Sequence, residues 1–120
     1  MKTYTICGSM RFEKEMKDIA YQLETQKGFN IFQCTYTPEN HIPSKKELNE
    51  IEKSHYKKID LSDGIYIVNI DYYIGESVKK EIEYAKELNK EIYYYEEYKT
   101  EVSNDIIKNK YKNQELDNEN

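Results

Sequence analysis

The chain has 120 residues, a length that fits one domain able to bury a core without disulfides or structural metals. Charged residues make up 34% of it and the net charge is −5, which argues against a protein that binds nucleic acid polymers or membranes, because both require a basic surface. The thirteen tyrosines add apolar area that hydropathy scales undercount, so the polar composition does not argue against a core.

The first part of the chain is predicted to form a strand, a helix and a second strand. Residues 3–7 are β-prone, and between residues 12 and 23 apolar side chains recur at helical spacing. Gly28 is expected to end this helix, because glycine readily takes the left-handed conformation that follows a helix. Residues 30–36 form the next β-prone run.

The middle of the chain predicts two further helices with a strand between them. The residues S-K-K-E at 44–47 fit a capping box, and we expect a helix from there to about residue 60. Residues 64–70 (G-I-Y-I-V-N-I) are the most apolar run and indicate a central strand covered on both faces. A loop with Gly75 leads to a third helix over about residues 77–89.

The last part of the chain is predicted to hold a fourth strand at residues 91–95 and a weakly amphipathic helix around residues 102–107. We expect one domain over residues 1–111 and a disordered tail over residues 112–120. Strands that alternate with helices predict an α/β fold, with a parallel sheet of about four to five strands and helices on both faces. Ligands of such sheets bind at the carboxyl ends of the strands, where the winding reverses.

The two cysteines, Cys7 and Cys34, do not form a disulfide framework and lie in runs that we expect to be strands. We interpret them as buried free thiols in a reducing compartment. The sequence has no Cys/His spacing typical of zinc sites, no signal-peptide core and no apolar run of membrane-spanning length. We therefore expect a cytoplasmic protein that holds no metal ion or cofactor and does not bind a membrane.

Two polar residues occupy apolar helix faces. On a helical wheel, Glu81 lies between Ala85 and Leu88 inside the apolar stripe of the third helix, and an unpaired carboxylate there would cost several kcal/mol. Either Glu81 is compensated or used, or its head reaches solvent near the helix start. His55 lies similarly in the second helix, as a satisfied core residue or as a partner that stabilises Glu81 and carries a proton.

The turn after the first strand combines Gly8, Ser9, Met10 and Arg11. Glycine allows a ligand to approach the backbone, while the serine and the first helical N–H groups can hold phosphate oxygens and the arginine can add charge. The alternative is an ordinary serine cap followed by a surface arginine. The same two interpretations, a ligand contact or a helix cap, apply to Ser77 at the start of the third helix.

Three motifs together resemble a known family. They are strand–G-S-x-R–helix, then D-x-S-D-G-I-Y-I-V-N, then G-E-S-x-x-x-E-I-x-Y-A-x-x-L-N-K. Over residues 3–96 the chain resembles the nucleoside 2-deoxyribosyltransferase-like superfamily, which includes the 2′-deoxynucleoside 5′-monophosphate N-hydrolases. The resemblance implies a small Rossmann-like (flavodoxin-like) fold, a homodimer or higher homo-oligomer, and a small nucleoside or nucleotide as partner.

The resemblance also implies roles for individual residues. Glu81 matches the glutamate that attacks C1′ of the sugar and forms a covalent glycosyl-enzyme, in a retaining mechanism. Gly8, Ser9 and Arg11 match the loop that binds the 5′-phosphate, and Tyr4 resembles a tyrosine near the nucleophile. The implied activity is cleavage or transfer of the N-glycosidic bond of a (deoxy)nucleoside 5′-monophosphate or related nucleotide.

The chain departs from the family at one predicted catalytic position. Counting eight residues back from Asp63 reaches His55, where the family usually has an aspartate that helps with base or proton transfer. We expect Asp60 to help place His55 or the sugar, and Asn69 and Ser77 to complete the substrate-binding set. The substitution by histidine leaves open a second function, in which the same pocket binds a nucleotide or nucleotide signal without turnover.

Overall fold

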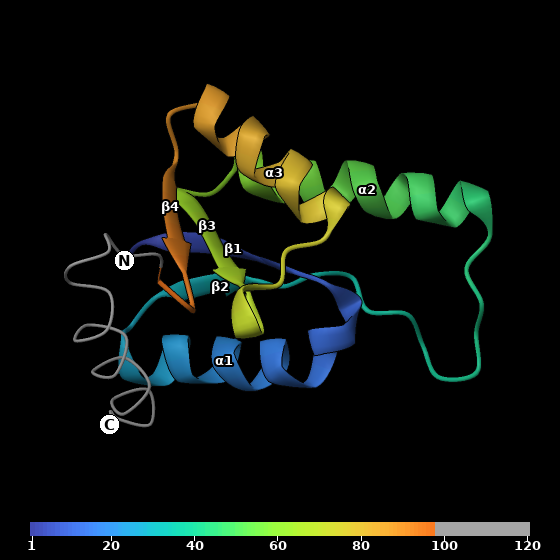
Figure 1. Ribbon diagram of the computed structural model, residues 1–120, viewed down its shortest axis with the longest axis horizontal. Coiled ribbons are helices and arrows are strands. Elements are labelled where there is room, and N and C mark those ends of the chain that lie inside the picture. Colours follow the sequence, from blue (N-terminus) through green and yellow to red (C-terminus); the bar gives the residue numbers. More distant parts are fainter. Residues whose placement is uncertain (98–120) are drawn as a thin grey trace.

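The computed structural model describes residues 1–97, which form one parallel sheet with helices on both faces. The strands, in the spatial order β2-β1-β3-β4, are β1 (Thr3–Gly8), β2 (Asn30–Phe32), β3 (Gly64–Val68) and β4 (Glu91–Tyr94). The helices are α1 (Glu13–Gln26), α2 (Lys45–Asp60) and α3 (Glu76–Glu87). Helix α1 covers one face of the sheet and α2 and α3 cover the other (Figure 1), which confirms the predicted α/β fold.

The sheet separates two apolar clusters, because alternate side chains of a strand point to opposite faces. Tyr4 and Ile6 of β1 belong to the cluster against α1, together with Met16. Cys7 belongs to the cluster beneath α2 and α3, together with Ile59 of α2. The two residues of β1 nearest its carboxyl end, Cys7 and Gly8, therefore face different helices.

The predicted start of α2 at Ser44 and the predicted end of α1 at Gly28 are both confirmed. Ser44 caps α2 as expected: its side chain accepts a hydrogen bond from the Glu47 backbone N–H, and the Glu47 side chain accepts one from the Ser44 N–H. Gly28 follows α1 with a φ of +72°, the left-handed conformation expected of a residue after a helix end. A short 3₁₀ helix, η1 (Met10–Phe12), connects β1 to α1.

Two strands are shorter than predicted by two residues or more, and β4 ends one residue early, at Tyr94. The predicted strand at residues 30–36 ends at Phe32, and the Gln33 carbonyl accepts a hydrogen bond from Lys58 Nζ of α2 at 2.7 Å. The predicted strand at residues 64–70 ends at Val68 and leads to a second 3₁₀ helix, η2 (Ile70–Tyr72). The predicted last helix and the predicted tail lie outside the described residues.

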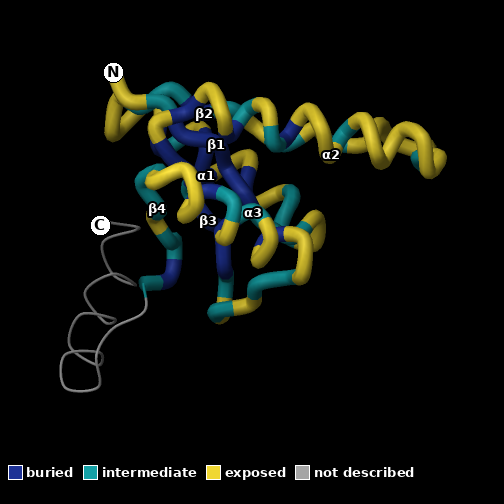
Figure 2. Tube along the Cα trace, turned by 90° about the horizontal axis from the view of Figure 1, so that it is seen from above, coloured by how far each residue is buried: buried dark blue, intermediate teal, exposed yellow. Residues whose placement is uncertain are grey.

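Helix α2 extends past the sheet at its amino-terminal half (Figure 1). Its predicted apolar stripe is therefore covered unevenly: Ile59 is fully buried, Ile51 is half-buried and Leu48 is 52% exposed. Figure 2 shows this protruding half as a mainly exposed segment. No helix within residues 1–97 combines the length and apolar character needed to cross a bilayer.

Candidate functional site

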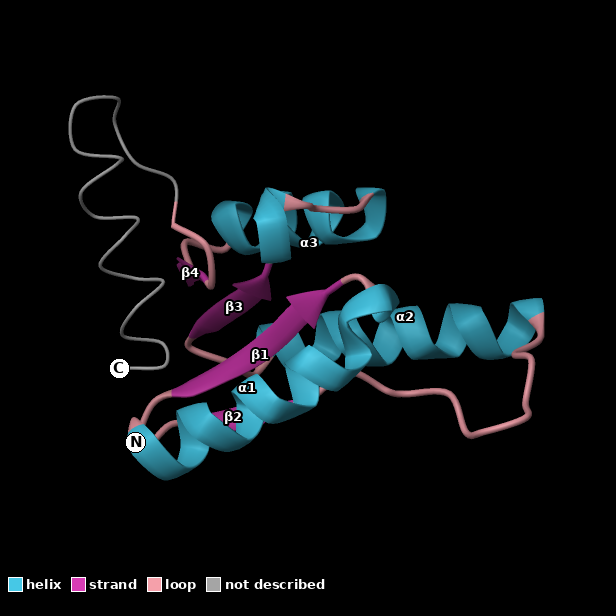
Figure 3. Cartoon of the chain, turned by 60° about the horizontal axis from the view of Figure 1, so that its bottom comes forward, coloured by secondary structure: helices cyan, strands magenta, loops and turns pink. Residues whose placement is uncertain are grey.

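A cleft of about 470 Å³ lies where β1 ends, beside α2 and the first turns of α3. Figure 3 shows the carboxyl end of β1 running to the side of α2, with α3 along the same face of the sheet. The chain passes from β1 to β2 on one side of β1 and then to β3 on its other side, so the winding of the sheet reverses at β1. The cleft therefore lies at the point where parallel sheets bind ligands. Its lining residues are Gly8, Ser9, Met10, Cys34, Thr35, Leu48, Asn49, Ile51, Glu52, His55, Gly75, Glu76, Ser77 and Glu81.

Three titratable side chains from three elements meet beside this cleft: His55 and Glu81 line it, and the fully buried Cys7 contacts His55 without lining it. His55 Nε2 of α2 lies 3.3 Å from Glu81 Oε1 of α3 and 3.5 Å from Cys7 Sγ of β1. The His55 and Glu81 side chains are only 11% and 14% exposed, and Cys7 is fully buried. The sequence predicted the pairing of His55 with Glu81 from their places on apolar helix faces, and the structure brings the two together.

The thiols near the cleft are held in their neutral form. Burial raises the pKa of Cys7 well above its usual range, and the negative charge of Glu81 raises it further. Burial is also the largest cause that raises the pKa of Cys34 to about 12. Because a thiolate is the reactive form of cysteine, neither residue is a nucleophile near neutral pH in this structure.

The predicted turn at residues 8–11 forms one end of the cleft. Gly8, Ser9 and Met10 line it, whereas Arg11 does not. Ser9 Oγ accepts a hydrogen bond from the Arg11 backbone N–H at 3.3 Å, as a cap of η1 does. The Arg11 guanidinium lies over the ring of Tyr73, 3.9 Å from its centroid, in a cation–π contact at the surface.

Two features require a glycine at residue 8: the close packing of β1 and the place of this residue in the wall of the cleft. A Cβ at this residue would lie 2.8 Å from Met16 Sδ and 3.1 Å from the Val68 carbonyl oxygen, closer than ordinary contacts allow. The glycine therefore lets β1 lie close to both α1 and β3. Its backbone is also open to the cleft, so the two requirements coincide at one residue.

The start of α3 supplies the opposite wall of the cleft. Gly75 is the N-cap, so Ser77 is not the cap of this helix but its second residue, and it lines the cleft. The Glu76 side chain is 85% exposed and pairs with Lys79 at 3.2 Å, which directs most of its surface to solvent.

Tyr4 does not lie at this site, contrary to our expectation. Its ring packs on the α1 face of the sheet at 5.0 Å from the Phe29 ring, and its hydroxyl donates to Glu91 Oε1 at 2.7 Å. Cys7, three positions along the same strand, lies on the other face of the sheet, in the cluster beneath α2 and α3. An odd separation along a strand reverses the side-chain direction, so Tyr4 is excluded from the group around Glu81.

Asp60 and Asn69 also lie apart from the cleft. Asp60 is at the carboxyl end of α2 and accepts a hydrogen bond from the Tyr84 hydroxyl, five residues beyond His55 and toward the other edge of the sheet. Both polar groups of the buried Asn69 amide bond the backbone of Glu96, with Nδ2 donating at 2.9 Å and Oδ1 accepting at 2.8 Å. We therefore assign Asp60 and Asn69 structural roles in place of the predicted binding roles.

The sequence interpretation missed Glu52 and Cys7. Glu52 lines the cleft one turn before His55, and the spacing of Leu48, Glu52 and His55 along one face of α2 is the signal that could have found it. Cys7 was interpreted only as a buried thiol. With Glu52, Glu76 and Glu81 present and no lysine or arginine among the described lining residues, the cleft has an acidic character.

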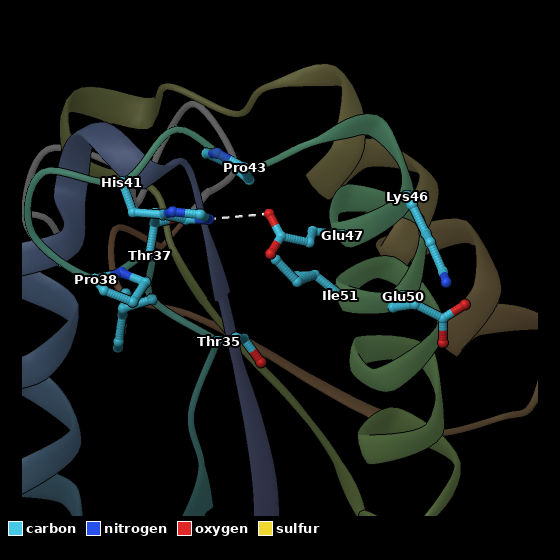
Figure 4. A pocket seen from close by; sticks show the side chains of 10 residues that line it. Thr35, Thr37, Pro38, His41, Pro43, Lys46, Glu47, Glu50 and Ile51 are labelled. Atoms are coloured by element: carbon cyan, nitrogen blue, oxygen red, sulfur yellow. Dashed lines mark hydrogen bonds and ion pairs between the residues drawn. The ribbon is translucent and has the colours of Figure 1, made fainter.

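A second, larger hollow of about 770 Å³ lies between the loop before α2 and the protruding half of that helix (Figure 4). Figure 4 shows His41 pointing across it to Glu47, with Nε2 and Oε1 2.9 Å apart. Thr35 and Ile51 line both cavities, so the hollow adjoins the cleft. The candidate site is the smaller cleft, because His55 and Glu81 of the buried Cys7–His55–Glu81 cluster line it at the carboxyl edge of the sheet.

No family model, curated protein or solved structure matches this chain. The family resemblance therefore stays a prediction that rests on the three sequence motifs, and so does the homo-oligomer that it implies. The parallel sheet and its order rest on the structure itself.

Proposed function

We propose that the protein cleaves or transfers the N-glycosidic bond of a (deoxy)nucleoside 5′-monophosphate or a related nucleotide, with Glu81 as the nucleophile. The observation that carries this proposal is the position of the Glu81 carboxylate, largely buried in a cleft at the carboxyl edge of the sheet and 3.3 Å from His55. The cleft volume of about 470 Å³ lies within the range of small-molecule sites.

The proposed reaction has two displacements at C1′ of the sugar. A Glu81 carboxylate oxygen forms a bond to C1′ while the C1′–N bond breaks, and the base leaves with that electron pair and takes up a proton. Water, or the nitrogen of a second base, then attacks C1′ from the face opposite Glu81. This step breaks the ester bond, frees the carboxylate and restores the original configuration at C1′.

His55 is suited to hold the carboxylate and to handle protons. Its Nε2 contacts Glu81 Oε1, and its ring is fixed by burial in the middle of α2. A histidine can donate a proton to a leaving base and accept one from water. An aspartate in the same place could do both, but it is neutral when protonated and negative otherwise, whereas histidine is positive when protonated and neutral otherwise.

The phosphate end of the substrate is assigned to the turn after β1. Ser9 and Met10 border the cleft, so we expect their backbone N–H groups to meet the phosphate, and the Arg11 side chain lies at the surface over the Tyr73 ring. The acidic lining elsewhere would repel a phosphate, so we expect the substrate to enter with its phosphate toward this turn and its sugar toward Glu81.

The test is incubation of Glu81→Gln with a panel of nucleosides and their 5′-monophosphates, with chromatography to detect the free base. The amide keeps the size of the side chain but cannot form the glycosyl ester, so base release should fall by at least about a thousandfold. Glu83→Gln is the matched control, because Glu83 lies on the same helix with a 70% exposed side chain and should keep wild-type activity.

Full activity of Glu81→Gln would overturn the proposed nucleophile. Equal rates for nucleosides and their 5′-monophosphates would instead show that the turn at Ser9 does not bind the phosphate. That result would not contradict the role of Glu81 as nucleophile. In wild-type protein, mass spectrometry of a rapidly quenched reaction should find the sugar on the peptide that contains Glu81.

A second candidate is nucleotide binding without turnover. The observation that favours it is the existing contact between Glu81 and His55, because a carboxylate engaged with an imidazole is a weaker nucleophile. Calorimetric titration with each nucleotide, followed by chromatography of the same mixture, separates the two functions. Heat of binding with no free base would support binding alone.

A further inference from the structure

The cluster of Cys7, His55 and Glu81 presents the three ligand types that zinc prefers, namely a thiol sulfur, an imidazole nitrogen and a carboxylate oxygen. One ligand atom of each residue lies within 4.8 Å of the others. The residues come from β1, α2 and α3, so no short sequence motif could reveal the set. We propose that this cluster binds one Zn²⁺ ion.

Two of the three separations within the cluster match those of a tetrahedral centre. Bond lengths of about 2.3 Å to sulfur and about 2.1 Å to nitrogen and oxygen, at tetrahedral angles, place sulfur and nitrogen roughly 3.5 Å apart and nitrogen and oxygen roughly 3.4 Å apart. The corresponding separations here are 3.5 Å for Cys7 Sγ to His55 Nε2 and 3.3 Å for His55 Nε2 to Glu81 Oε1. The third separation, from Cys7 Sγ to a Glu81 carboxylate oxygen, is within 4.8 Å, so closing it on the ion is the adjustment that binding requires.

Hydrogen bonds hold this arrangement in the absence of a metal. His55 Nε2 is the shared neighbour of the Cys7 sulfur and the Glu81 oxygen, and because one ring nitrogen carries at most one proton, it donates to only one of them. The Cys7 thiol has two further acceptors, the Thr5 carbonyl oxygen at 3.8 Å and the Glu81 carboxylate. A metal ion between the three atoms would replace these hydrogen bonds by three ligand bonds.

Charge and ligand softness select the ion. On binding, the Cys7 thiol releases its proton to solvent, so the thiolate and the Glu81 carboxylate together neutralise Zn²⁺. Thiolate ligation favours zinc over magnesium or calcium, which prefer oxygen ligands alone. The acidic cleft adds attraction for a cation, since Glu52 and Glu76 also line it and no described lining residue is a lysine or arginine.

Three protein ligands would leave the fourth position of a tetrahedral site for water, which can reach it from the cleft that His55 and Glu81 line. Three protein ligands with a water in the fourth position is the usual arrangement of a zinc site that can exchange ligands. The same carboxylate cannot bind zinc and attack a sugar, so zinc and glycosyl transfer exclude one another at Glu81. Zinc binding itself does not depend on the proposed function, because it needs no nucleotide.

The test uses Co²⁺, which reports on zinc geometry, with the full chain first stripped of metal by a chelator. We expect one equivalent of Co²⁺ to give the visible bands of a tetrahedral site and the near-ultraviolet band of cobalt bonded to a thiolate, and Zn²⁺ to displace both. Cys7→Ser should lose the thiolate band, and Glu81→Gln should weaken binding by at least roughly a hundredfold. Cys34→Ser is the matched control and should keep the full spectrum.

The proposal is overturned if one equivalent of Co²⁺ gives no thiolate band, or if that band survives in Cys7→Ser or disappears in Cys34→Ser. X-ray absorption of the zinc-loaded wild-type protein tests the same ligand set without substitutions. One sulfur and three nitrogen or oxygen neighbours support the site, and any other sulfur count contradicts it. Failure of these measurements leaves the Glu81 nucleophile untouched, because base release is measured without metal.

Discussion

Glu91, at the start of β4, joins three side chains at the edge of the sheet opposite the cleft. It accepts hydrogen bonds from Lys2, from the Tyr4 hydroxyl at 2.7 Å and from the Tyr93 hydroxyl at 3.3 Å. The bond from Lys2 is the largest cause that lowers the pKa of Glu91 below its usual value, and the bond from Tyr4 is the next. The residue predicted to assist catalysis, Tyr4, instead helps to stabilise the fold here.

The lowered pKa predicts how stability depends on pH. A carboxylate with a lower pKa in the folded state contributes stability above its unfolded pKa of about 4.3 and loses it as pH falls through the folded value. We expect Glu91→Gln to be less stable than wild type at pH 7, and the difference to shrink as pH falls from about 5 toward 3. Urea unfolding at a series of pH values measures this.

The control for Glu91→Gln is Glu83→Gln, which removes an exposed partner of Lys86 at 3.7 Å. An exposed pair at this distance contributes little, so the free energy of unfolding of this variant should follow wild type across the pH range. A difference between Glu91→Gln and wild type that stays constant from pH 7 to pH 3 would contradict the role given to Glu91.

Helix α2 shows which elements a sequence can predict. Its start was found from S-K-K-E alone, because a capping box needs only residues within one turn. The end of β2 was not found from spacing, and the carbonyl of the next residue, Gln33, bonds Lys58, which is 25 residues away. Local hydrogen bonds can be predicted from spacing, whereas contacts with distant side chains at a strand end cannot.

The cap of α2 can be tested directly. Ser44→Ala removes the acceptor of the Glu47 N–H, so we expect a loss of about 1 kcal/mol in the free energy of helix formation. Because this half of α2 extends past the sheet, the effect should appear first as faster amide hydrogen exchange in the first turns of the helix.

The control for Ser44→Ala is Ser54→Ala, an exposed serine in the middle of the same helix. Alanine has the higher helix propensity, so this variant should exchange no faster than wild type. Equal exchange in the first turn of wild type and Ser44→Ala would mean that the capping box does not hold this end of α2.

For the whole molecule, the alternation of strands and helices in the sequence was enough to predict the α/β class and its layers. The residues of the candidate site could be predicted only in part. Glu81 and His55 were found because each was polar on an apolar helix face. Cys7 could not be found in this way, since a cysteine in a strand is ordinary. Arg11 and Asp60 were assigned by motif, and their placement depends on contacts with Tyr73 and Tyr84 that sequence spacing does not encode.

The link between Asn69 and Glu96 holds the carboxyl end of β3 to the chain that follows β4. Asn69→Ala removes both hydrogen bonds and leaves two buried backbone groups of Glu96 without these partners, so we expect a loss of about 2 to 3 kcal/mol in stability. Urea unfolding measures the loss, and the substrate concentration at half-maximal rate should not change.

Asn49→Ala is the control, because Asn49 is an exposed cleft-lining residue of α2 whose loss should leave stability unchanged. If Asn69→Ala kept wild-type stability and weakened substrate binding, the structural role assigned to Asn69 would be wrong and the role expected from the sequence would be restored.

The cleft is assembled from residues far apart along the chain, since Ser9 follows β1, His55 belongs to α2 and Glu81 belongs to α3. An unfolded chain cannot hold all three residues within reach of one molecule. A ligand that contacts them therefore binds only the folded chain and, at a hundred times its dissociation constant, opposes unfolding by about 2.7 kcal/mol. Resistance to heat or to proteolysis thus reports occupancy of the cleft, whether or not the bound molecule is consumed.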